Sequence, residues 1–468
     1  MSGTQPIELV PKLRARTAAA VADRRLGRSL AAATDTFVGR KAAAYGHLAD
    51  VEAVGDEARG IRARILARLP ELLEQLANNV MAAGGHVHWA GDAADANAYI
   101  VELAKARGVD AVVKSKSMVT EETALNDALE AAGCTVTETD LGEWIIQVAH
   151  ETPSHIIVPA IHKDRRQVAE TLSRVADGDL SDVPEELAAF ARTRLRQRFL
   201  EAGMGISGVN FGVAETGSLV LVTNEGNGRL VTSVPPIHVA VMGMERVVAT
   251  VADLDVLLAL LPRAATGQAI TTYVSMITGP RRPPEPDGPE ELHLVLLDNG
   301  RSDILGTEFT EMLACIRCGA CLNACPVYRQ VGGHAYGWVY SGPMGAVLTP
   351  LLNHSDAAQE VAQASSLCGA CWDACPVGIP LQDMLLGLRR RNAEASTTRV
   401  ERMAWAAWAA TWSRPGRYRA SLRGASRGFR LMGSPAHAPG HVDRWSLGRT
   451  LPVPGKRSFR DLWKDGIL

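Results

Sequence analysis

Residues 315–326 read Cys-Ile-Arg-Cys-Gly-Ala-Cys-Leu-Asn-Ala-Cys-Pro. The spacing of the four cysteines predicts the structure of this region. Two residues separate each of the first three cysteines, three separate the third from the fourth, and a proline follows. This is the spacing of bacterial ferredoxins. Residues 368–376 repeat the last three cysteine positions and the proline. Because such gaps let three thiolates of one loop converge on one cubane, the two stretches predict two iron–sulfur clusters.

Each cluster is expected to take ligands from both stretches. In two-cluster ferredoxins the fourth cysteine of a run ligates the other cluster. This rule assigns to one centre, named cluster one, the residues Cys315, Cys318, Cys321 and Cys375. It assigns to a second centre, named cluster two, the residues Cys325, Cys368 and Cys371.

Cluster two has one thiolate fewer than cluster one, because Ser365 stands at the position that matches Cys315. The centre is therefore either a [4Fe–4S] cluster with a non-cysteine or exchangeable ligand at one iron, or a [3Fe–4S] cluster. A serine oxygen is a hard ligand among soft thiolates. Zinc is the alternative metal, but zinc sites require neither this spacing nor the proline. The eighth cysteine, Cys134, is expected to be a small buried hydrophobic residue.

The composition limits the class of protein. The chain has 468 residues, of which 47% are hydrophobic and 21% charged, and this is typical of a folded protein with roughly two to four domains. A formal net charge of −2 argues against a nucleic-acid partner. No stretch approaches the ~18 apolar residues of a transmembrane segment, and the chain starts without an apolar signal segment. We therefore expect a cytoplasmic protein, in a reducing compartment where clustered cysteines bind metal.

Composition also divides the chain into four regions. They are a helical arm (1–70), an α/β domain (71–300), a small helical ferredoxin-type domain (301–395) and a basic, Trp-rich extension (396–468). The extension has 14 Arg or Lys against 4 Asp or Glu. Its Trp405, Trp408 and Trp412 share one face of an expected helix. This face is expected to dock on a partner subunit, to contact a membrane surface peripherally, or to pack against the cluster region.

The region 71–300 alternates between short strands and helices, which predicts a mostly parallel sheet covered by helices. The first strands are expected at 86–89, 109–114 and 134–139, with helices over 92–105 and 121–132. Further strands are expected at 155–159, 209–213, 218–223, 238–242 and 293–297. Gly203, Gly205 and Gly208 match the dinucleotide fingerprint, but they follow an expected helix and precede a strand, which is the wrong context. Gly203 is instead expected to end that helix.

Polar side chains at the ends of these strands are candidates for a ligand site. Lys114 ends the second expected strand and Lys116 follows it, and Glu215 lies in the turn between two later strands. Since α/β folds bind ligands at the carboxyl ends of strands, one lysine would hold a carboxylate or phosphate, with Glu215 as a base or orienting group. The alternative is a solvated loop and an ordinary glycine turn. His155 and His162 are expected to be core or loop histidines.

Together these segments resemble the lactate utilisation protein B family. The resemblance rests on KSKSMVTEE (114–122), GVAETGSLVLVTNEGNGR (212–229), PPIHVAVMGMERVV (235–248), HLVLLDNGR (293–301), CIRCGACLNACPVYRQVGGHAYG (315–337) and SSLCGACWDACPVGIPL (365–381). It implies an α/β domain similar in fold to the NagB/RpiA/CoA-transferase group, the seven cysteines as cluster ligands, and Ser365 as a family feature. It also implies two companion subunits in the oxidation of L-lactate to pyruvate. It implies no catalytic residue.

The leading hypothesis is therefore an iron–sulfur electron-transfer subunit of an L-lactate-oxidising complex. It would work with two companion subunits and an electron acceptor of unknown identity. Two clusters with interleaved ligands lie close together, which suits a relay. The alternative hypothesis makes this chain the catalytic subunit, with the substrate bound beside Lys114, Lys116 and Glu215. That hypothesis is weaker, since the sequence has no flavin or nicotinamide motif.

Overall fold

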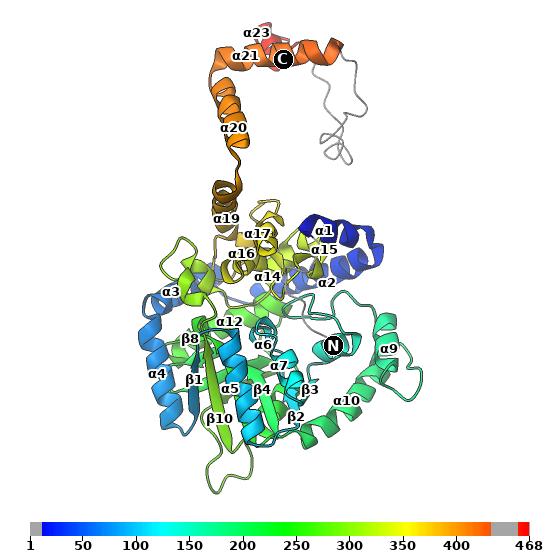
Figure 1. Ribbon diagram of the computed structural model, residues 1–468, viewed down its shortest axis with the longest axis vertical. Helices are drawn as coiled ribbons and strands as arrows, with labels where there is room; N and C mark the ends of the chain where they lie inside the picture. The colour runs from blue at the N-terminus through cyan, green and yellow to red at the C-terminus, as the bar shows by residue number, and fades with distance from the viewer. Residues whose placement is uncertain (1–11, 432–456, 468) are drawn as a thin grey trace. The chain divides into compact units, whose positions relative to one another are not determined.

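Six parallel strands form the larger sheet of this computed structural model, which describes residues 12–431 and 457–467 (Figure 1). The strand order is β1-β10-β7-β4-β2-β3. The strands are β1 His86–Ala90, β2 Ala111–Lys114, β3 Thr135–Glu138, β4 Met204–Gly208, β7 Ile237–Gly243 and β10 Glu291–Leu297. Every residue of β7 is buried, because helices cover both faces of such a sheet. The expected mostly parallel α/β sheet is thus confirmed, whereas the likeness to the NagB/RpiA group stays a prediction.

A smaller sheet of mixed direction has the order β8-β5-β6-β9. Its strands are β5 Phe211–Val213, β6 Ser218–Thr223, β8 Val247–Val248 and β9 Tyr273–Ile277. β5 runs parallel to β8 and antiparallel to β6, and β6 runs antiparallel to β9. Because β7 continues through a short turn into β8, the two sheets share a connection at the carboxyl end of the larger one.

Helices surround both sheets. They are α4 Leu69–Ala82, α5 Ala93–Ala106, α6 Met118–Glu122, α7 Leu125–Ala131, α8 Leu141–Ala149, α9 Arg165–Ser173, α10 Pro184–Glu201, α11 Asn227–Ser233 and α12 Val251–Thr266. α5 begins as expected at Asp92, whose side chain accepts a hydrogen bond from the Asp95 amide (2.9 Å), the usual role of an N-cap residue.

Two expected elements differ in the structure. Residues 155–159 form turns, not a strand, because the amides of Ile157 and Val158 both donate to Nδ1 of His155 (3.0 and 3.2 Å). The single helix expected over 121–132 is two helices, α6 and α7, because Ala124 between them has a left-handed backbone (φ +52°). A non-glycine residue in this region costs about 1–2 kcal/mol, so tertiary contacts must stabilise the break.

The strand β4, Met204–Gly208, was not expected from the sequence, which predicted a strand there only from residue 209 onward. Gly203 follows the C-cap residue Ala202 and does not have the left-handed backbone of a helix-ending glycine. Gly205 lies inside the strand, where a Cβ would approach the carbonyl oxygen of Val231 to 1.9 Å. The glycine thus lets α11 pack directly on the sheet. The strand conformation of Gly205 also agrees with the prediction that these glycines are in the wrong context for a dinucleotide fingerprint.

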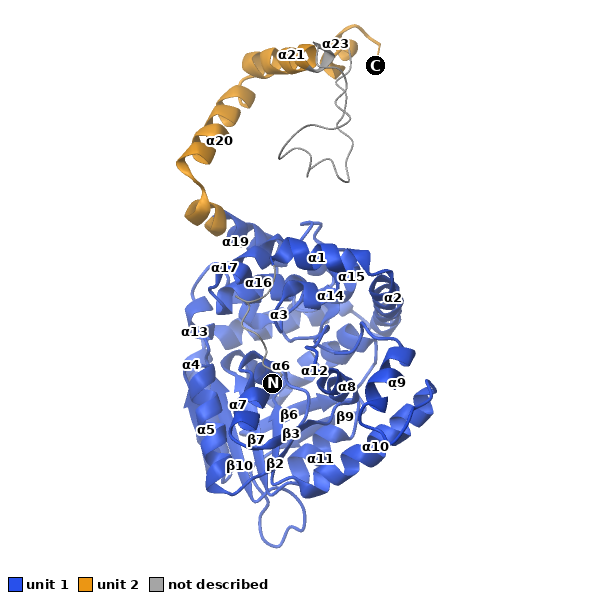
Figure 2. Ribbon diagram, turned by 45° about the vertical axis from the view of Figure 1, so that its right-hand side comes forward, with its two compact units in different colours: residues 1–390 blue, residues 391–468 orange. Residues whose placement is uncertain are grey.

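The N-terminal helices and the cysteine region lie together at one end of the unit 1–390 (Figures 1 and 2). The N-terminal helices are α1 Leu13–Ala22, α2 Arg24–Tyr45 and α3 Val51–Ala67. The helices after the last strand are α13 Arg301–Ile304, α14 Ala320–Ala324, α15 Tyr328–Val331, α16 Gly342–Leu352, α17 Asp356–Glu360, α18 Ala370–Asp373 and α19 Leu381–Ser396, with 3-10 turns at Thr310–Ala314, His334–Tyr336 and Val361–Gln363. One hydrophobic core includes Leu30, Ile61, Met242 and Leu322. The cysteine region therefore shares its core with the α/β region.

The second compact unit, residues 391–468, contains α20 Arg399–Trp412, α21 Pro415–Leu431 and α23 Phe459–Lys464 (Figure 2). No residue of α20 is buried. The indole rings of Trp405, Trp408 and Trp412 contact one another in sequence order. Their centroids lie 5.8 Å apart between Trp405 and Trp408, and 5.4 Å apart between Trp408 and Trp412. Among the described residues, no helix is long and apolar enough to cross a membrane.

Candidate iron–sulfur centres and the adjoining cavity

The structure brings the seven cysteines together in two sets. Those of the first set line one small cavity, and they are Cys315, Cys318, Cys321 and Cys375. Those of the second set influence one another electrostatically, and they are Cys325, Cys368 and Cys371. These are the sets that the crossed assignment groups together. Ligation itself stays a prediction.

The two cysteine loops have the same local conformation. Arg317 and Leu367 both have a left-handed backbone, with φ of +59° and +56°, and a glycine with positive φ follows each next cysteine. The amide of Arg317 donates to Sγ of Cys315 (3.4 Å), and that of Leu367 donates to Oγ of Ser365 (3.0 Å). Ser365 therefore occupies the place that the fourth thiolate of cluster two would have.

The environments of the two sets differ. Burial, with repulsion between neighbouring thiolates, raises the pKa of Cys318 to about 12 and the pKa of Cys321 well above its usual value. Cys368 is exposed, and hydrogen bonds from Ser366 and the backbone lower the pKa of its thiol. Because their pKa values are raised, the buried thiols stay protonated in the absence of a metal. A metal cation such as iron is needed to stabilise their thiolate form.

Three cationic side chains beside the cluster-one set form their hydrogen bonds with backbone carbonyls, not with carboxylates. Arg62 is fully buried and donates to four carbonyl oxygens at 2.5–3.3 Å. Arg246 donates to the carbonyls of Cys315 (2.7 Å) and Asn210 (2.6 Å), and Lys41 to that of Ala374 (2.5 Å). Burial lowers the pKa of both arginines to about 10. Buried cations need nearby counter-charge. Glu245 offsets part of the charge of both arginines, and a cluster held by four thiolates, which is negative, would offset more of it.

Tyr336 lies between the two sets. Its side chain is fully buried, and its hydroxyl has no hydrogen-bond partner among the described residues. Burial, and then the nearby thiolates of Cys325, Cys321 and Cys371, raise its pKa well above the usual value. A buried hydroxyl is expected to have a partner, and a cluster sulfur is the acceptor that this position offers. The residues of both sets therefore fit iron–sulfur clusters.

A cavity of about 330 Å³ lies at the carboxyl ends of β2, β3, β4 and β7. Its charged lining residues are Lys116, Asp140, Glu225, Glu245, Arg246, Arg301 and Arg317. Ile156 lines both this cavity and the small cavity of the cluster-one set. One layer of side chains therefore separates the cavity from cluster one.

Of the three residues that the sequence analysis singled out, Lys116 alone lines this cavity. Lys114 is fully buried, and its Nζ forms ion pairs with Glu121 and Glu138, both at 2.7 Å. Glu215 accepts a hydrogen bond from the amide of Val251 at the start of α12 (2.6 Å). Lys114 and Glu215 thus stabilise the fold locally, and the expectation that they share one ligand cleft with Lys116 is corrected.

A buried ion-pair network joins the far end of the cavity to the cysteine loop. Arg301 pairs with Glu122 (2.8 Å) and Glu245 (2.7 Å), and Arg317 pairs with Glu245 (3.1 Å). The hydroxyl of Tyr340 donates to Glu122 (2.5 Å). Although burial alone would raise the pKa of Glu245, the adjacent Arg301 and Arg317 lower it to about 2. The network also explains the break after α6, because it draws Glu122 into the core.

Comparison with known proteins shows the family. Residues 73–297 match the LUD domain, 311–379 the 4Fe-4S dicluster domain, and 388–466 the C-terminal domain of lactate utilisation protein B. Lactate utilization protein B of Bacillus licheniformis is 48% identical over 414 residues, 87% of each chain. The chain belongs to the lactate utilisation protein B family. The Shouchella clausii relative is 49% identical over 87% of each chain, and the Bacillus subtilis relative 46% identical over 86% of each chain.

In this member of the lactate utilisation protein B family, the 4Fe-4S dicluster domain spans all seven clustered cysteines. A solved structure of a DUF162 family protein from Deinococcus radiodurans covers 49% of this chain and 98% of its own, at 12% identity and a TM-score of 0.27. That likeness is too low to inform the fold.

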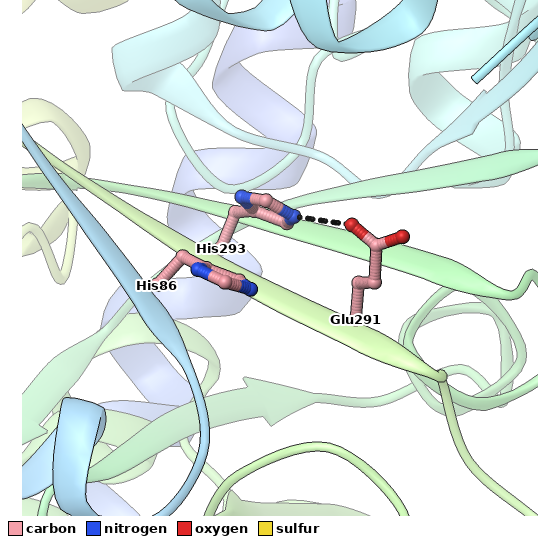
Figure 3. A group of neighbouring side chains, drawn as sticks. All are labelled: His86, Glu291 and His293. Carbon is pink, nitrogen blue, oxygen red and sulfur yellow. Dashed lines mark hydrogen bonds and ion pairs between the residues drawn. The ribbon is translucent and has the colours of Figure 1, made fainter. Parts of the chain in front are cut away.

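Another polar group of this family member lies at the edge of the larger sheet, where Figure 3 shows His86, Glu291 and His293. Their ligand atoms lie within 4.8 Å of one another. The two imidazole rings stack, however, with centroids 4.7 Å apart and planes at 21°, so their lone pairs do not converge on one ion. Glu291 pairs with Arg107 (2.8 Å), and Tyr99 bonds to His293 (2.7 Å). Protein partners account for the group without a metal.

Arg62, Glu245 and Arg246 were not among the residues expected from the sequence to belong to the site, although a signal was present. Arg62 stands between apolar residues on the buried face of α3, and Glu245 and Arg246 interrupt an apolar run between β7 and β8. Charged residues in such positions are rarely buried without a partner. The two expected loop histidines have protein contacts: His155 accepts the amides named above, and Nε2 of His162 lies 2.6 Å from Glu151.

Proposed function

We propose that this chain is the iron–sulfur electron carrier of a lactate-oxidising system, in which cluster one is the internal centre and cluster two the centre at the surface. The observation that carries this proposal is the arrangement of the cysteines. The cysteines of one set are buried or partly buried beside a cavity, the other set has one exposed member, Cys368, and both sets lie near Tyr336. Each cluster, when bound, takes up and gives up one electron at a time. The relatives' name, lactate utilization protein B, supports lactate as the source of electrons.

The residues around cluster one favour uptake of an electron there. Reduction adds negative charge, and the cations Lys41, Arg62 and Arg246 offset that charge inside a medium of low dielectric constant. Tyr336 has a free hydroxyl to donate toward either set. On the other side, Cys368 is exposed, and the side chain of Trp372 beside it is 48% exposed. A redox partner therefore has more direct access to cluster two, at Cys368, than to cluster one.

The proposed cofactor content is two clusters per chain. Four thiolates supply cluster one as a [4Fe–4S] centre. Three thiolates and Ser365 supply cluster two, as a [4Fe–4S] centre with one labile iron or as a [3Fe–4S] centre.

The proposed partners are two companion lactate-utilisation subunits and an electron acceptor, and the C-terminal unit is the candidate for docking. Trp405, Trp408 and Trp412 are between 46% and 65% exposed. The following helix, α21, has no acidic residue in its 17 positions. An exposed aromatic face followed by a basic helix suits a partner subunit or peripheral contact with an anionic membrane surface.

Anaerobic reconstitution of the full-length chain tests the relay. Iron and sulfide would be counted, and the dithionite-reduced protein examined by electron paramagnetic resonance (EPR) spectroscopy. We expect seven or eight irons, roughly the content of two clusters, and interacting signals from two centres. A single cluster, zinc alone, or two centres that do not exchange electrons on stepwise reduction would reject the proposal.

The cavity beside cluster one supports a second candidate, in which this chain itself oxidises lactate. The isolated, cluster-loaded chain would be assayed with L-lactate and an artificial electron acceptor. Turnover without companion subunits would favour this candidate, and its absence, with both clusters intact, would favour the carrier.

A further inference from the structure

The cavity contains a buried cation that the protein leaves without a partner. Nζ of Lys116 is buried and has no hydrogen-bond partner among the described residues. Burial lowers its pKa, and the nearby carboxylates of Asp140, Glu143 and Glu225 oppose that shift without forming an ion pair. Lys116 also lines the cavity. An unsatisfied buried ammonium is costly, so an anionic group of a ligand is the natural partner.

The surrounding carboxyl groups restrict what that ligand is. Oδ1 of Asp140 caps α8, and Oε2 of Glu225 accepts the amide of Leu141 (3.3 Å). Glu225 itself lines the cavity, and partial burial and the neighbouring Asp140 raise its pKa to about 7, so that it is partly protonated near neutral pH. A protonated carboxyl group both donates and accepts. It therefore suits a hydroxyl or a carbonyl oxygen next to the ligand's anionic group, while Asp140 repels a second negative charge.

We propose that this cavity binds a small monocarboxylate with a hydroxyl or oxo group on C2, whose carboxylate pairs with Lys116 and whose C2 oxygen bonds to Glu225, since both side chains line the cavity. The choice of ligand class rests in part on the proposed role in lactate utilisation, whereas the site itself rests on the cavity and its unpaired groups. The volume, about 330 Å³, is at the small end for ligand sites.

The position of the cavity links its occupancy to cluster one. Ile156 forms a wall shared with the cluster-one cavity. Arg246 lines the cavity and binds the carbonyl of Cys315, and Arg317 lines it and donates its amide to the sulfur of Cys315. A carboxylate bound here therefore changes the electrostatic surroundings of cluster one without ligating it.

The test uses the full-length chain with both clusters loaded anaerobically. Isothermal titration calorimetry would measure binding of L-lactate, pyruvate, propionate and inorganic phosphate. We expect L-lactate and pyruvate to bind about tenfold more tightly than propionate, which lacks the C2 oxygen and so one hydrogen bond. Phosphate is expected to bind more weakly still, because of its second charge. L-lactate should also shift the EPR signal of cluster one.

Lys116→Met is expected to weaken L-lactate binding at least roughly tenfold, as loss of a charged hydrogen bond does, and to abolish the EPR shift. Since Nζ of Lys116 has no hydrogen-bond partner within residues 12–431 and 457–467, the variant should fold and keep its iron. Lys116→Arg retains the charge and should keep measurable binding. Lys105→Met changes an exposed lysine on α5 and is the matched control, expected to bind like the parent chain.

Three results would overturn the proposal: unchanged binding in Lys116→Met, equal binding of propionate or phosphate, or no binding by protein that carries both clusters. Failure of the electron-carrier function is separately visible, because iron content and the EPR signals of both centres are measured on the same samples. A chain with one cluster that still binds L-lactate through Lys116 would reject the relay and keep the cavity assignment.

Discussion

The two cysteine sets share one loop conformation and differ in almost everything around it. The set of cluster one is enclosed by the N-terminal helices, by the turns at 155–159 and by the cations Lys41, Arg62 and Arg246. The set of cluster two has a serine at one position, an exposed Cys368 and the partly buried Arg389, which donates to the carbonyl of Ser365 (2.8 Å). A repeated sequence motif thus provides two similar ligand loops, and the surroundings of each loop decide its chemistry.

The largest expected effect comes from removing a ligand on each side. Cys321→Ser is expected to lose cluster one, with roughly half of the bound iron, and to lower the melting temperature markedly, because Arg62 and Arg246 then have, among the described residues, only Glu245 to offset their charge. Cys368→Ser should lose or alter cluster two with a smaller thermal effect, since its surroundings are exposed. Iron analysis and anaerobic thermal unfolding measure both. Equal destabilisation by the two variants would contradict the inferred difference between the surroundings of the two cysteine sets.

A second variant gives both cysteine sets four thiolates. Ser365→Cys supplies a fourth thiolate in a loop that already has the conformation of its counterpart. We expect cluster two to become a stable [4Fe–4S] centre that loses iron to a chelator more slowly and has a lower reduction potential, because the new thiolate adds negative charge. EPR spectroscopy and chelator kinetics check this. An unchanged rate of iron loss would show that Ser365 does not face the labile corner.

A third variant removes a cation, Lys41, from the surroundings of cluster one. Reduction makes a cluster more negative, so a nearby cation favours the reduced form. Lys41→Gln should therefore lower the potential of cluster one by roughly 50 mV, the one-electron equivalent of about 1 kcal/mol. The potential of cluster two should hardly change. Lys105→Gln is the control in a redox titration, and an equal shift at both centres would contradict the local effect of Lys41.

The smallest expected effect is a pH dependence of ligand binding. Partial burial and the neighbouring Asp140 raise the pKa of Glu225 to about 7, although much of its side chain is exposed. Above that pH the ionised group competes for Lys116, so carboxylate affinity should fall as the pH rises from about 6 to 8. The same raised pKa means that Glu225 contributes less to folding stability as the pH rises from its usual value of 4.5 toward 7.

Glu225→Gln should flatten the affinity profile for L-lactate across that pH range, and calorimetry at several pH values measures it. Asp140 and Lys116 face Glu225 and are unchanged in this variant. A profile as steep as that of the parent chain would assign the pH dependence to another group.

Strands and helices that depend on local sequence patterns were predicted correctly, whereas those that depend on distant contacts were not. Strands such as β2, β6 and β7 have runs of apolar residues between glycine or polar turns, and such local patterns survive folding. β4 was missed because its glycines, which weaken strand propensity, are needed for close packing against α11. The division between α6 and α7 was missed because the buried network that binds Glu122 is assembled from residues distant in sequence.

The sequence by itself determined the two cysteine loops, their crossed grouping, the parallel sheet and the family, because each depends on local spacing or on long continuous motifs. Only the tertiary structure decided that Cys368 is exposed whereas Cys318 and Cys321 are buried, and that Lys116, but not Lys114 or Glu215, lines a cavity beside cluster one. The reason is physical: burial and unpaired charge arise from contacts between segments far apart in the chain, such as Arg62 of α3 with the loop before Cys315.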